Sequence, residues 1–458
     1  MLFSSITFIY FFLPILLMLY GAVSVICPKS TGHTLQNLVL CMMSCLFYAW
    51  GEPYYIFLML VQILIVYGLS LIMERKQEKR AGTIAYLLAI LFPLSSLFYF
   101  KYSGIKNLTL PIGISFYTFQ LVSYAIDVRR RVVKPPKSLL TFMTYVTFFP
   151  QLIAGPIVRY SDMERELTER TRTNQDMADG IVRFSVGLAK KVLLANVLGE
   201  FVQEASQIGQ RSLALSWGYA LAVSLQLYFD FSGYSDMAIG LGRMFGFHFP
   251  ENFQYPFISK SMTEFWRRWH MTLGAWFRDY VYIPLGGNRV RPARWVLNIL
   301  IVWTLTGLWH GAGWNFAVWG LYFGVLLIVE RAVKINDSSV FCKVLQHVYV
   351  VVGILISFLI FHEENMDHAW LAITSLWKIP VSVDEACGYL LRNRLGILAL
   401  GIIGATPLPR ILWGKLCTWL NREWMIRSIQ GVAVLVLMVL CTAYLIDGSF
   451  NPFLYFRF

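Results

Sequence analysis

Stretches of about twenty residues that contain no Asp, Glu, Lys or Arg recur along the whole chain. A helix needs about 20 consecutive apolar residues to cross the hydrocarbon core of a bilayer, so the pattern predicts an all-α polytopic membrane protein with about eleven transmembrane helices. The charge-free runs span residues 4–26, 34–50, 53–73, 81–100, 108–126, 138–158, 212–229, 295–329, 344–361, 395–409 and 428–446.

The composition excludes other classes of protein. Only 14% of the residues are charged, whereas soluble domains carry about 25%. The 34 Phe, 24 Tyr and 15 Trp also exclude a disordered chain. Because the run 4–26 is long enough to span a membrane, we expect it to be a retained helix and not a cleaved signal peptide.

The net charge of +13 is concentrated in short clusters between the apolar runs, most clearly at 74–80 and 129–137. Basic clusters of this kind face the cytoplasm, which predicts that the N-terminus and the acidic patch 362–368 face outward. We therefore attribute the charge to membrane topology and expect no nucleic-acid partner. The seven cysteines contain no C-x-x-C pair, so we expect neither a disulfide framework nor a metal site.

Two apolar runs are unsuited to a plain transmembrane helix. The run 138–158 carries Pro150, Gly155 and Pro156 in its second half, which predicts a segment that enters the membrane and returns. The run 295–329 would form a helix of roughly 52 Å, too long for a bilayer core of about 30 Å. We expect it to break in the glycine-rich stretch 307–313.

The segment 250–294 is amphipathic and interleaves tryptophans with arginines. Phe265, Trp269, Leu273 and Phe277 recur every four residues, which indicates one apolar stripe on a helix. This pattern favours a helix embedded at the cytoplasmic interface, or the wall of a funnel.

Two histidines are candidates for catalysis. His310 lies at the glycine-rich break. Because an ionisable side chain at membrane depth costs free energy, such a residue is a candidate for function. Burial would favour its neutral form, which can accept a proton near neutral pH. His270 lies in the amphipathic segment. It is either a second polar group facing the same cavity or an interfacial histidine hydrogen-bonded to backbone, whereas the alternative for His310 is a structural residue hydrogen-bonded between helices.

Asp230, Asp236 and Asn315 are candidate polar groups that either orient His310 or hold the fold together. The two carboxylates end an apolar run, where they could pair with the arginines of the segment 250–294. A purely structural ion pair is the alternative reading.

Arg267, Arg268 and Arg278 could bind the phosphates of a cytoplasmic acyl donor, because a guanidinium group matches phosphate oxygens in a fork. Contact with lipid headgroups is the alternative reading of the same three arginines.

The motifs FFPQLIAGP, DFSGYSDM, FWRRWH, PLGGNR and GLWHG lie in four blocks, 148–160, 230–247, 249–289 and 305–324, and a fifth block, SFYTFQLVSYAIDV, covers 115–128. Together these blocks resemble the membrane-bound O-acyltransferases, most closely the alginate O-acetylase subfamily. The resemblance implies a multi-helix fold in which short re-entrant helices surround a central tunnel. It maps the invariant histidine of the family onto His310, and the second family histidine onto His270.

The resemblance also implies the reaction. Relatives take an acyl group from a cytoplasmic thioester such as acetyl-CoA and deliver it to a hydroxyl on or beyond the outer face. We expect no permanently bound cofactor, a polysaccharide acceptor, an extracytoplasmic acetyltransferase as partner protein, and a place in the bacterial cytoplasmic membrane. The tail 451–458 is similar to an acyl-carrying tail of the D-alanylation system, so Tyr455 is either an acyl relay or an aromatic membrane anchor.

Two other functions fit the pattern less well. A transporter or flippase for a lipid-linked saccharide would also use broken helices, but the chain has no paired halves. A membrane scaffold would not explain a histidine at a glycine-rich break. We expect a single membrane domain over 1–458, with N-terminal spans at 1–100, a catalytic core at 101–330 and further spans at 331–458.

Overall fold

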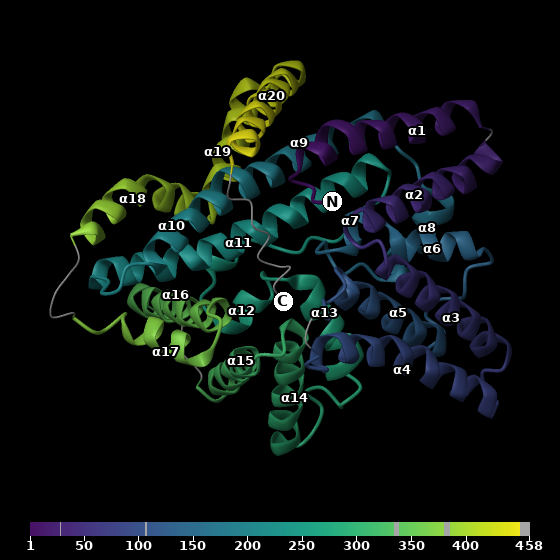
Figure 1. The fold of residues 1–458 in the computed structure, drawn as a ribbon, viewed down its shortest axis with the longest axis horizontal. Coiled ribbons are helices and arrows are strands. Elements are labelled where there is room, and N and C mark those ends of the chain that lie inside the picture. Colours follow the sequence, from purple (N-terminus) through teal and green to yellow (C-terminus); the bar gives the residue numbers. More distant parts are fainter. Residues whose placement is uncertain (28, 106–107, 334–338, 380–384, 449–458) are drawn as a thin grey trace. The chain divides into compact units, whose positions relative to one another are not determined.

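The computed structural model describes residues 1–27, 29–105, 108–333, 339–379 and 385–448. Within these ranges all regular elements are helices, which confirms the predicted fold class (Figure 1). The chain divides into two compact units, and each is described separately. Unit 1 comprises Met1–Ser185 and Tyr234–Pro250, and unit 2 comprises Val186–Gly233 and Glu251–Phe458.

Unit 1 is built from the N-terminal helices, and the helices α9 and α11 contribute residues to both units. The helices of unit 1 are α1 (Leu13–Ile26), α2 (Lys29–Gly51), α3 (Tyr55–Arg75), α4 (Arg80–Tyr102), α5 (Ile114–Arg129), α6 (Leu139–Thr147), α7 (Phe149–Leu152) and α8 (Tyr160–Glu169). The shared helices are α9 (Asn174–Ala189) and α11 (Leu213–Met244).

Unit 2 contains the remaining helices. A π-helical turn at Lys190–Asn196 follows α9 directly. The other helices are α10 (Val197–Ser206), α12 (Met262–Trp266), α13 (Met271–Phe277), α14 (Pro292–His310), α15 (Trp314–Ala332), α16 (Val340–His362), α17 (Met366–Thr374), α18 (Ala386–Gly404), α19 (Leu408–Leu420) and α20 (Glu423–Asp447).

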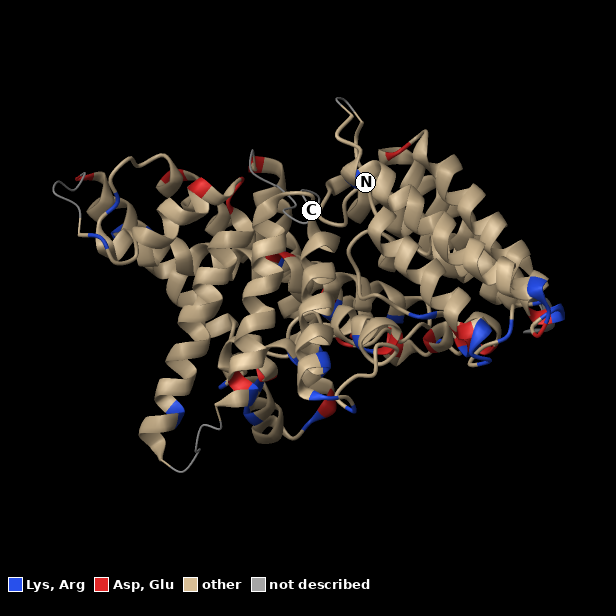
Figure 2. Ribbon diagram, turned by 90° about the horizontal axis from the view of Figure 1, so that it is seen from below, with Lys and Arg blue, Asp and Glu red and all other residues tan. Residues whose placement is uncertain are grey.

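Among the described residues, eight helical segments are long and apolar enough to cross a membrane. Lys, Arg, Asp and Glu gather mainly at the helix ends and in the connections (Figure 2). The expected count of about eleven is not reached, because several apolar runs fold differently. The run 108–126 forms only the 16-residue α5, and 138–158 forms two short helices. The eight segments are Phe8–Ile26, Gly32–Gly51, Tyr55–Arg75, Arg80–Tyr102, Trp314–Ala332, Val340–His362, Ala386–Gly404 and Glu423–Asp447.

The predicted break within 138–158 is present. The helix α6 ends at Thr147, α7 covers only four residues, and no regular helix follows until Tyr160. The irregular backbone is covered by protein, because Phe148, Phe149 and Leu152 are fully buried. The Tyr145 hydroxyl donates a hydrogen bond to the Val158 carbonyl at 3.0 Å. Such cover is what a membrane protein needs where its helices are interrupted.

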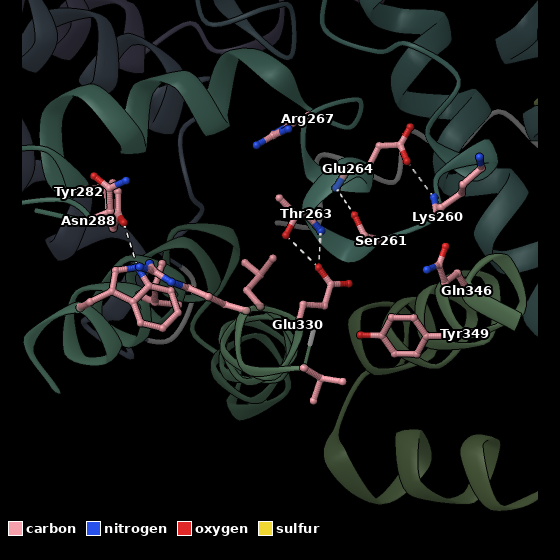
Figure 3. Close-up of a pocket in the computed structure, with 15 residues that line it drawn as sticks. Lys260, Ser261, Thr263, Glu264, Arg267, Tyr282, Asn288, Glu330, Gln346 and Tyr349 are labelled. Carbon is pink, nitrogen blue, oxygen red and sulfur yellow. Dashed lines mark hydrogen bonds between the residues drawn. The ribbon is translucent and has the colours of Figure 1, made fainter. Parts of the chain in front are cut away.

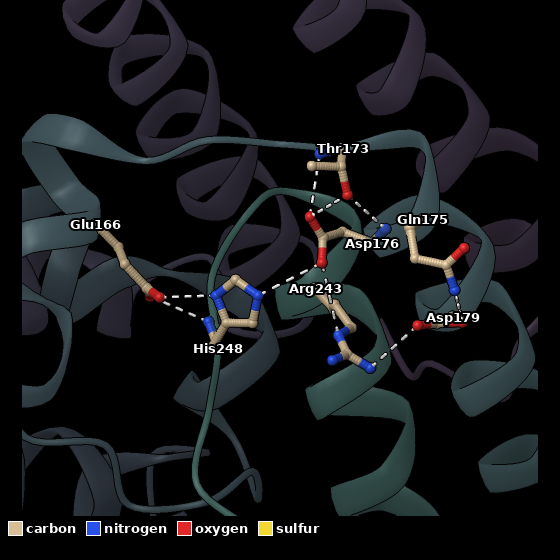
Figure 4. Close-up of polar contacts among 7 residues, drawn as sticks. All are labelled: Glu166, Thr173, Gln175, Asp176, Asp179, Arg243 and His248. Atoms are coloured by element: carbon tan, nitrogen blue, oxygen red, sulfur yellow. Dashed lines mark hydrogen bonds and ion pairs between the residues drawn. The ribbon is translucent and has the colours of Figure 1, made fainter.

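A network of charged side chains links α8, α9 and the end of α11 within unit 1 (Figure 4). The His248 ring lies between two carboxylates, with Nδ1 2.8 Å from Glu166 and Nε2 3.5 Å from Asp176. Arg243 lies 3.9 Å from Asp176 and 3.7 Å from Asp179. The His248 side chain is half exposed, so the network is a partly solvated structural contact.

The predicted break of the run 295–329 is also present. The helix α14 ends at His310 and α15 begins at Trp314, and the two pack against each other as a hairpin. Glycines allow the two backbones to touch: a Cβ atom on Gly307 would lie 2.2 Å from the Phe316 carbonyl oxygen, and one on Gly320 would lie 2.2 Å from the Trp303 carbonyl oxygen. Small residues permit such close helix contacts in membranes.

Candidate active site

His310 is the last residue of α14 and is 6% exposed. Its ring packs edge-on against three aromatic rings, with centroid distances of 4.8 Å to Trp309, 5.1 Å to Trp319 and 5.1 Å to Phe361. The glycine-rich break therefore places this imidazole in a pocket of aromatic side chains, where water competes little for its nitrogen atoms.

His270 lies in the tight turn between α12 and α13 and is 1% exposed. Its backbone has φ +43° and ψ +52°, in the left-handed region. That conformation costs a residue with a side chain roughly 1–2 kcal/mol, and such strain is concentrated at functional sites. Burial lowers the pKa of the His270 imidazole to about 3, so this histidine is neutral at physiological pH.

The side chain of Asn252 holds this turn. Its Oδ1 accepts hydrogen bonds from the Thr272 backbone N–H at 3.2 Å and from the Thr272 hydroxyl at 2.9 Å, and lies 3.1 Å from His270 Nδ1. The Asn252 carbonyl also accepts a hydrogen bond from the backbone N–H of Met271 at 3.0 Å. The sequence analysis missed Asn252, because its partners lie 18 to 20 residues along an irregular chain.

One tryptophan contacts both candidate histidines. The ring centroid of Trp309 lies 6.2 Å from that of His270 and 4.8 Å from that of His310. Phe231 of α11 closes the other side of His270, edge-on at 4.7 Å. The structure thus brings the two predicted histidines into one aromatic cluster within unit 2, although 40 residues separate them in the sequence.

The predicted pairing of the two carboxylates with the arginines of 250–294 is not what the structure shows. Asp230 instead pairs with Lys191 at 2.5 Å, and both side chains are buried. Asp236 pairs with Arg183 at 2.6 Å. Lys191 lies in the π-helical turn, and π-turns are frequent at functional sites. The sequence hid this turn, because nothing in its pattern separates a π-helical from an α-helical register.

Asn315 has a structural environment. Its side-chain amide donates hydrogen bonds to the Ile360 carbonyl at 3.4 Å and to the Glu363 carbonyl at 3.1 Å. These contacts tie the start of α15 to the end of α16, where carbonyl groups lack partners within the helix.

The three predicted donor-binding arginines differ in their surroundings. Arg268 pairs with Glu264 of α12 at 3.0 Å, and Arg278 pairs with its neighbour Asp279 at 2.6 Å. Within the described part of the chain, we find no ion pair for the exposed Arg267. Tyr455, the predicted acyl relay, lies outside the described residues, so that role stays a prediction.

Two cavities lie within unit 2, one with several charged side chains in its lining and one lined mainly by apolar and aromatic side chains. The first, of about 950 Å³, is lined by three cationic side chains, Lys260, Arg267 and Arg331. Figure 3 labels the first two of them. The second, of about 610 Å³, is lined by Trp266, Trp303 and Thr306. Five residues line both cavities, so the two are contiguous. They are Thr263, Arg267, Tyr282, Ile299 and Leu327.

The second cavity includes in its lining a residue one helical turn from the candidate base. Thr306 lines it and precedes His310 by four residues on α14, a rise of about 6 Å. His310 itself belongs to neither lining. Two carboxylates also line the first cavity: Glu264, which pairs with Arg268 at 3.0 Å, and Glu330, which accepts hydrogen bonds from the backbone N–H and the hydroxyl of Thr263. The lining of the first cavity thus carries three cations against two carboxylates, and one of these carboxylates is paired with an arginine outside the lining.

Comparison with known proteins identifies one family and several relatives. The sequence model of the membrane-bound O-acyltransferase family matches residues 31–366. A probable alginate O-acetylase of Azotobacter vinelandii is 34% identical over the full length of both chains. A peptidoglycan O-acetyltransferase of Helicobacter pylori is 34% identical over 72% of this chain and 71% of its own. A teichoic acid D-alanyltransferase of Bacillus subtilis is 32% identical over 48% of this chain and 59% of its own.

Proposed function

The chain belongs to the membrane-bound O-acyltransferase family, and we propose that it moves an acetyl group from a cytoplasmic thioester to a hydroxyl of an extracytoplasmic polysaccharide or of a relay partner protein. As a multi-pass membrane O-acyltransferase it needs a base, a path for the donor and a dry reaction site. The observation that carries the proposal is the pair of contiguous cavities, which runs from three cations to one helical turn before His310.

The chemistry is assigned to His310. Its neutral imidazole takes the proton of the acceptor hydroxyl as the oxygen attacks the thioester carbonyl carbon. The tetrahedral intermediate collapses, the carbon–sulfur bond breaks, and the thiolate leaves and takes the proton back from the imidazolium. An ester and a free thiol result. The aromatic rings around His310 exclude water, which would otherwise hydrolyse the donor.

The donor is assigned to the cationic cavity. Acetyl-CoA carries phosphates, for which Lys260, Arg267 and Arg331 offer charge-assisted hydrogen bonds. Its thin pantetheine arm suits the second cavity, which has tryptophans on its wall. Arg331 lies 4.1 Å over the Trp295 ring, so its guanidinium plane is held in place at the cavity edge.

Removing two of these charges should weaken donor binding without changing the chemistry. The double variant Lys260→Ala, Arg267→Ala is expected to raise the KM for acetyl-CoA about tenfold or more with kcat retained, because phosphate contacts act equally in ground and transition states. Initial rates in proteoliposomes measure both constants. The control is Arg165→Ala, which removes an arginine that is 89% exposed in unit 1. An unchanged KM in the double variant would remove the donor from this cavity.

A bulky side chain in the second cavity should block the path of the donor's pantetheine arm to His310. Gly274 lines it, and a Cβ atom added there meets no atom closer than 3.9 Å, so Gly274→Leu adds bulk without a backbone clash. We expect acetyl transfer to fall at least about tenfold while the protein stays folded, since the arm no longer reaches the base. The matched control is Gly68→Leu in α3, where a Cβ atom has open space. Normal turnover in Gly274→Leu would show that the donor takes another path.

The donor and acceptor are tested directly with purified protein in liposomes. Radiolabelled acetyl-CoA is supplied with candidate polysaccharides and with candidate extracytoplasmic acetyltransferases. We expect label on one of these acceptors and unlabelled CoA as the second product. Transfer of label from a D-alanyl thioester, with none from acetyl-CoA, would overturn the assigned donor. Protease protection in sealed vesicles tests the proposed topology in the bacterial cytoplasmic membrane. We expect the segment 129–137 on the cytoplasmic side.

The tail supplies one further part of the proposal. Tyr455 would carry the acetyl group briefly before it reaches the final acceptor. The protein is incubated with labelled donor, the reaction is quenched and the protein is digested. The mass of the peptide that contains Tyr455 is then measured by mass spectrometry. Absence of label from this peptide during turnover excludes the relay.

A further inference from the structure

Glu330, near the end of α15, binds the start of the short helix α12. Its carboxylate accepts hydrogen bonds from the backbone N–H of Met262, from the backbone N–H of Thr263 at 3.0 Å and from the Thr263 hydroxyl at 2.9 Å. Figure 3 shows the Glu330 side chain turned toward Thr263, with dashed lines for the two bonds between them. One carboxylate thus satisfies two of the first N–H groups of α12, which have no partners inside the helix.

The helix α12 lies along α15 and runs in the opposite direction. Thr263 at its start contacts Glu330, whereas Trp266 at its end packs against Phe323 and Trp319, with ring centroids 4.8 Å and 5.7 Å away. Burial of apolar surface is non-directional, whereas a hydrogen bond has a strict geometry. The three bonds to Glu330 therefore fix where α12 stands along α15.

The short length of α12 makes this anchor important. The helix covers only the five residues Met262–Trp266, and isolated helices shorter than about 12–15 residues are marginal in water. A local cap is present, because the Ser261 hydroxyl oxygen accepts from the Glu264 backbone N–H at 3.0 Å. This cap holds the shape of the first turn but does not tie it to another helix. The bonds from Glu330 supply that tie.

The anchored segment forms part of the wall of both cavities. Thr263 and Arg267 line both of them, and Trp266 lines the second. Arg267 follows α12 directly, and its backbone N–H lies 3.3 Å from the Thr263 carbonyl oxygen and 3.1 Å from that of Glu264. A shift of the first turn would therefore be passed on to Arg267. Glu330 itself lines the first cavity, so the anchor lies at the same site.

We propose that Glu330 is a positioning residue, which fixes α12 along α15 and so holds Arg267 where it binds the phosphates of the acyl donor. The inference rests on the proposed function and deepens it, because it gives a carboxylate a part in binding an anionic donor. The hairpin of α14 and α15 carries His310 at its closed end and Glu330 near its open end. The anchor thereby sets the phosphate site at a defined distance from the base.

Anchoring and simple charge predict opposite changes in the KM for the donor. If Glu330 only lined the cavity, its carboxylate would repel phosphates, and removing the charge would lower the KM. If Glu330 anchors α12, its loss lets Arg267 move away from the phosphates, and the KM rises. The direction of the change therefore decides between the two roles.

Two variants separate the anchor from the charge. Glu330→Ala removes both, whereas Glu330→Gln removes the charge and keeps one acceptor oxygen. We expect the KM for acetyl-CoA to rise about tenfold in Glu330→Ala and by less in Glu330→Gln, with kcat retained in both. A KM in Glu330→Ala equal to or below that of the wild type would overturn the proposal. The control is Glu78→Ala, which removes a carboxylate that is 89% exposed in unit 1.

A double-mutant cycle with Arg267 separates positioning from a general loss of structure. In an Arg267→Ala background, Glu330→Ala should change the KM by less than about twofold, because the residue that it positions is already absent. A general loss of structure predicts the same change in both backgrounds, together with a lower kcat and a lower yield. That outcome would overturn the proposal.

Hydrogen–deuterium exchange of the full-length protein in liposomes tests the anchor without turnover. In Glu330→Ala the backbone N–H groups of Met262 and Thr263 lose their acceptor, so the peptide 261–268 should exchange about tenfold faster. Exchange as slow as in the wild type would refute the anchor even if the chain transfers acetyl groups. Faster exchange in a chain that transfers no acyl group from any thioester would support the anchor and refute only the proposed function.

Discussion

Replacing His310 with alanine is expected to lower acyl transfer by about 10²–10⁴-fold, the contribution of a general base. His310 is the imidazole at the glycine-rich break, in a dry aromatic cluster one turn beyond the cavity that ends at Thr306. Without it, the reaction loses the group to which we assign the hydroxyl proton. Transfer is measured as labelled product formed per mole of protein in liposomes.

The alanine variant also leaves a gap between Trp319 and Phe361, whose rings both pack against His310. His310→Gln therefore accompanies it, because glutamine fills much of the same volume but is no base at neutral pH. His368→Ala is the control for an exposed histidine. If His310→Gln reaches the membrane in normal amounts and transfers acetyl groups normally, His310 is not the base.

Replacing Gly320 with alanine should destabilise the folded protein and so lower the amount of active protein. The added Cβ atom would lie 2.2 Å from the Trp303 carbonyl oxygen, and this neighbour is backbone that cannot rotate away. Overpacking of this kind costs about 1–3 kcal/mol and more where nothing can yield. We expect a lower unfolding temperature in detergent and faster digestion by protease.

Gly396→Ala in α18 is the control for this change, because a Cβ atom at that position meets nothing within 4 Å. It should leave the unfolding temperature unchanged or raise it slightly, as alanine favours helix more than glycine does. Equal unfolding temperatures for both variants would mean that α14 and α15 do not pack through their glycines.

The apolar runs predicted the helices well because membrane depth imposes one requirement on many successive residues. The break of the run 295–329 followed from length alone, since 35 residues exceed the bilayer core. The number of spans did not follow, because α5, with 16 residues, is shorter than its apolar run. An apolar run does not fix the ends of a helix, because α11 has 32 residues and extends well beyond the run 212–229.

The candidate site was predicted unevenly. His310 and His270 could be singled out by residue type and by their setting, and both lie in the aromatic cluster. The pairing of Asp230 with Lys191 could not be predicted, because the π-helical turn changes which face of the helix Lys191 occupies. The contacts of Asn252 with the His270 turn could not be predicted either, since they depend on a left-handed backbone conformation that only the folded chain defines.

The contact of backbone on backbone between α14 and α15 has a mechanical consequence. With no side chain between Gly307 and Gly320, the two helices cannot slide or roll without a collision of main-chain atoms, so they move as a single rigid strut. The ring of Phe361, which packs against His310 at 5.1 Å, comes instead from α16, so a shift of α16 would change the packing around His310 without separating α14 from α15.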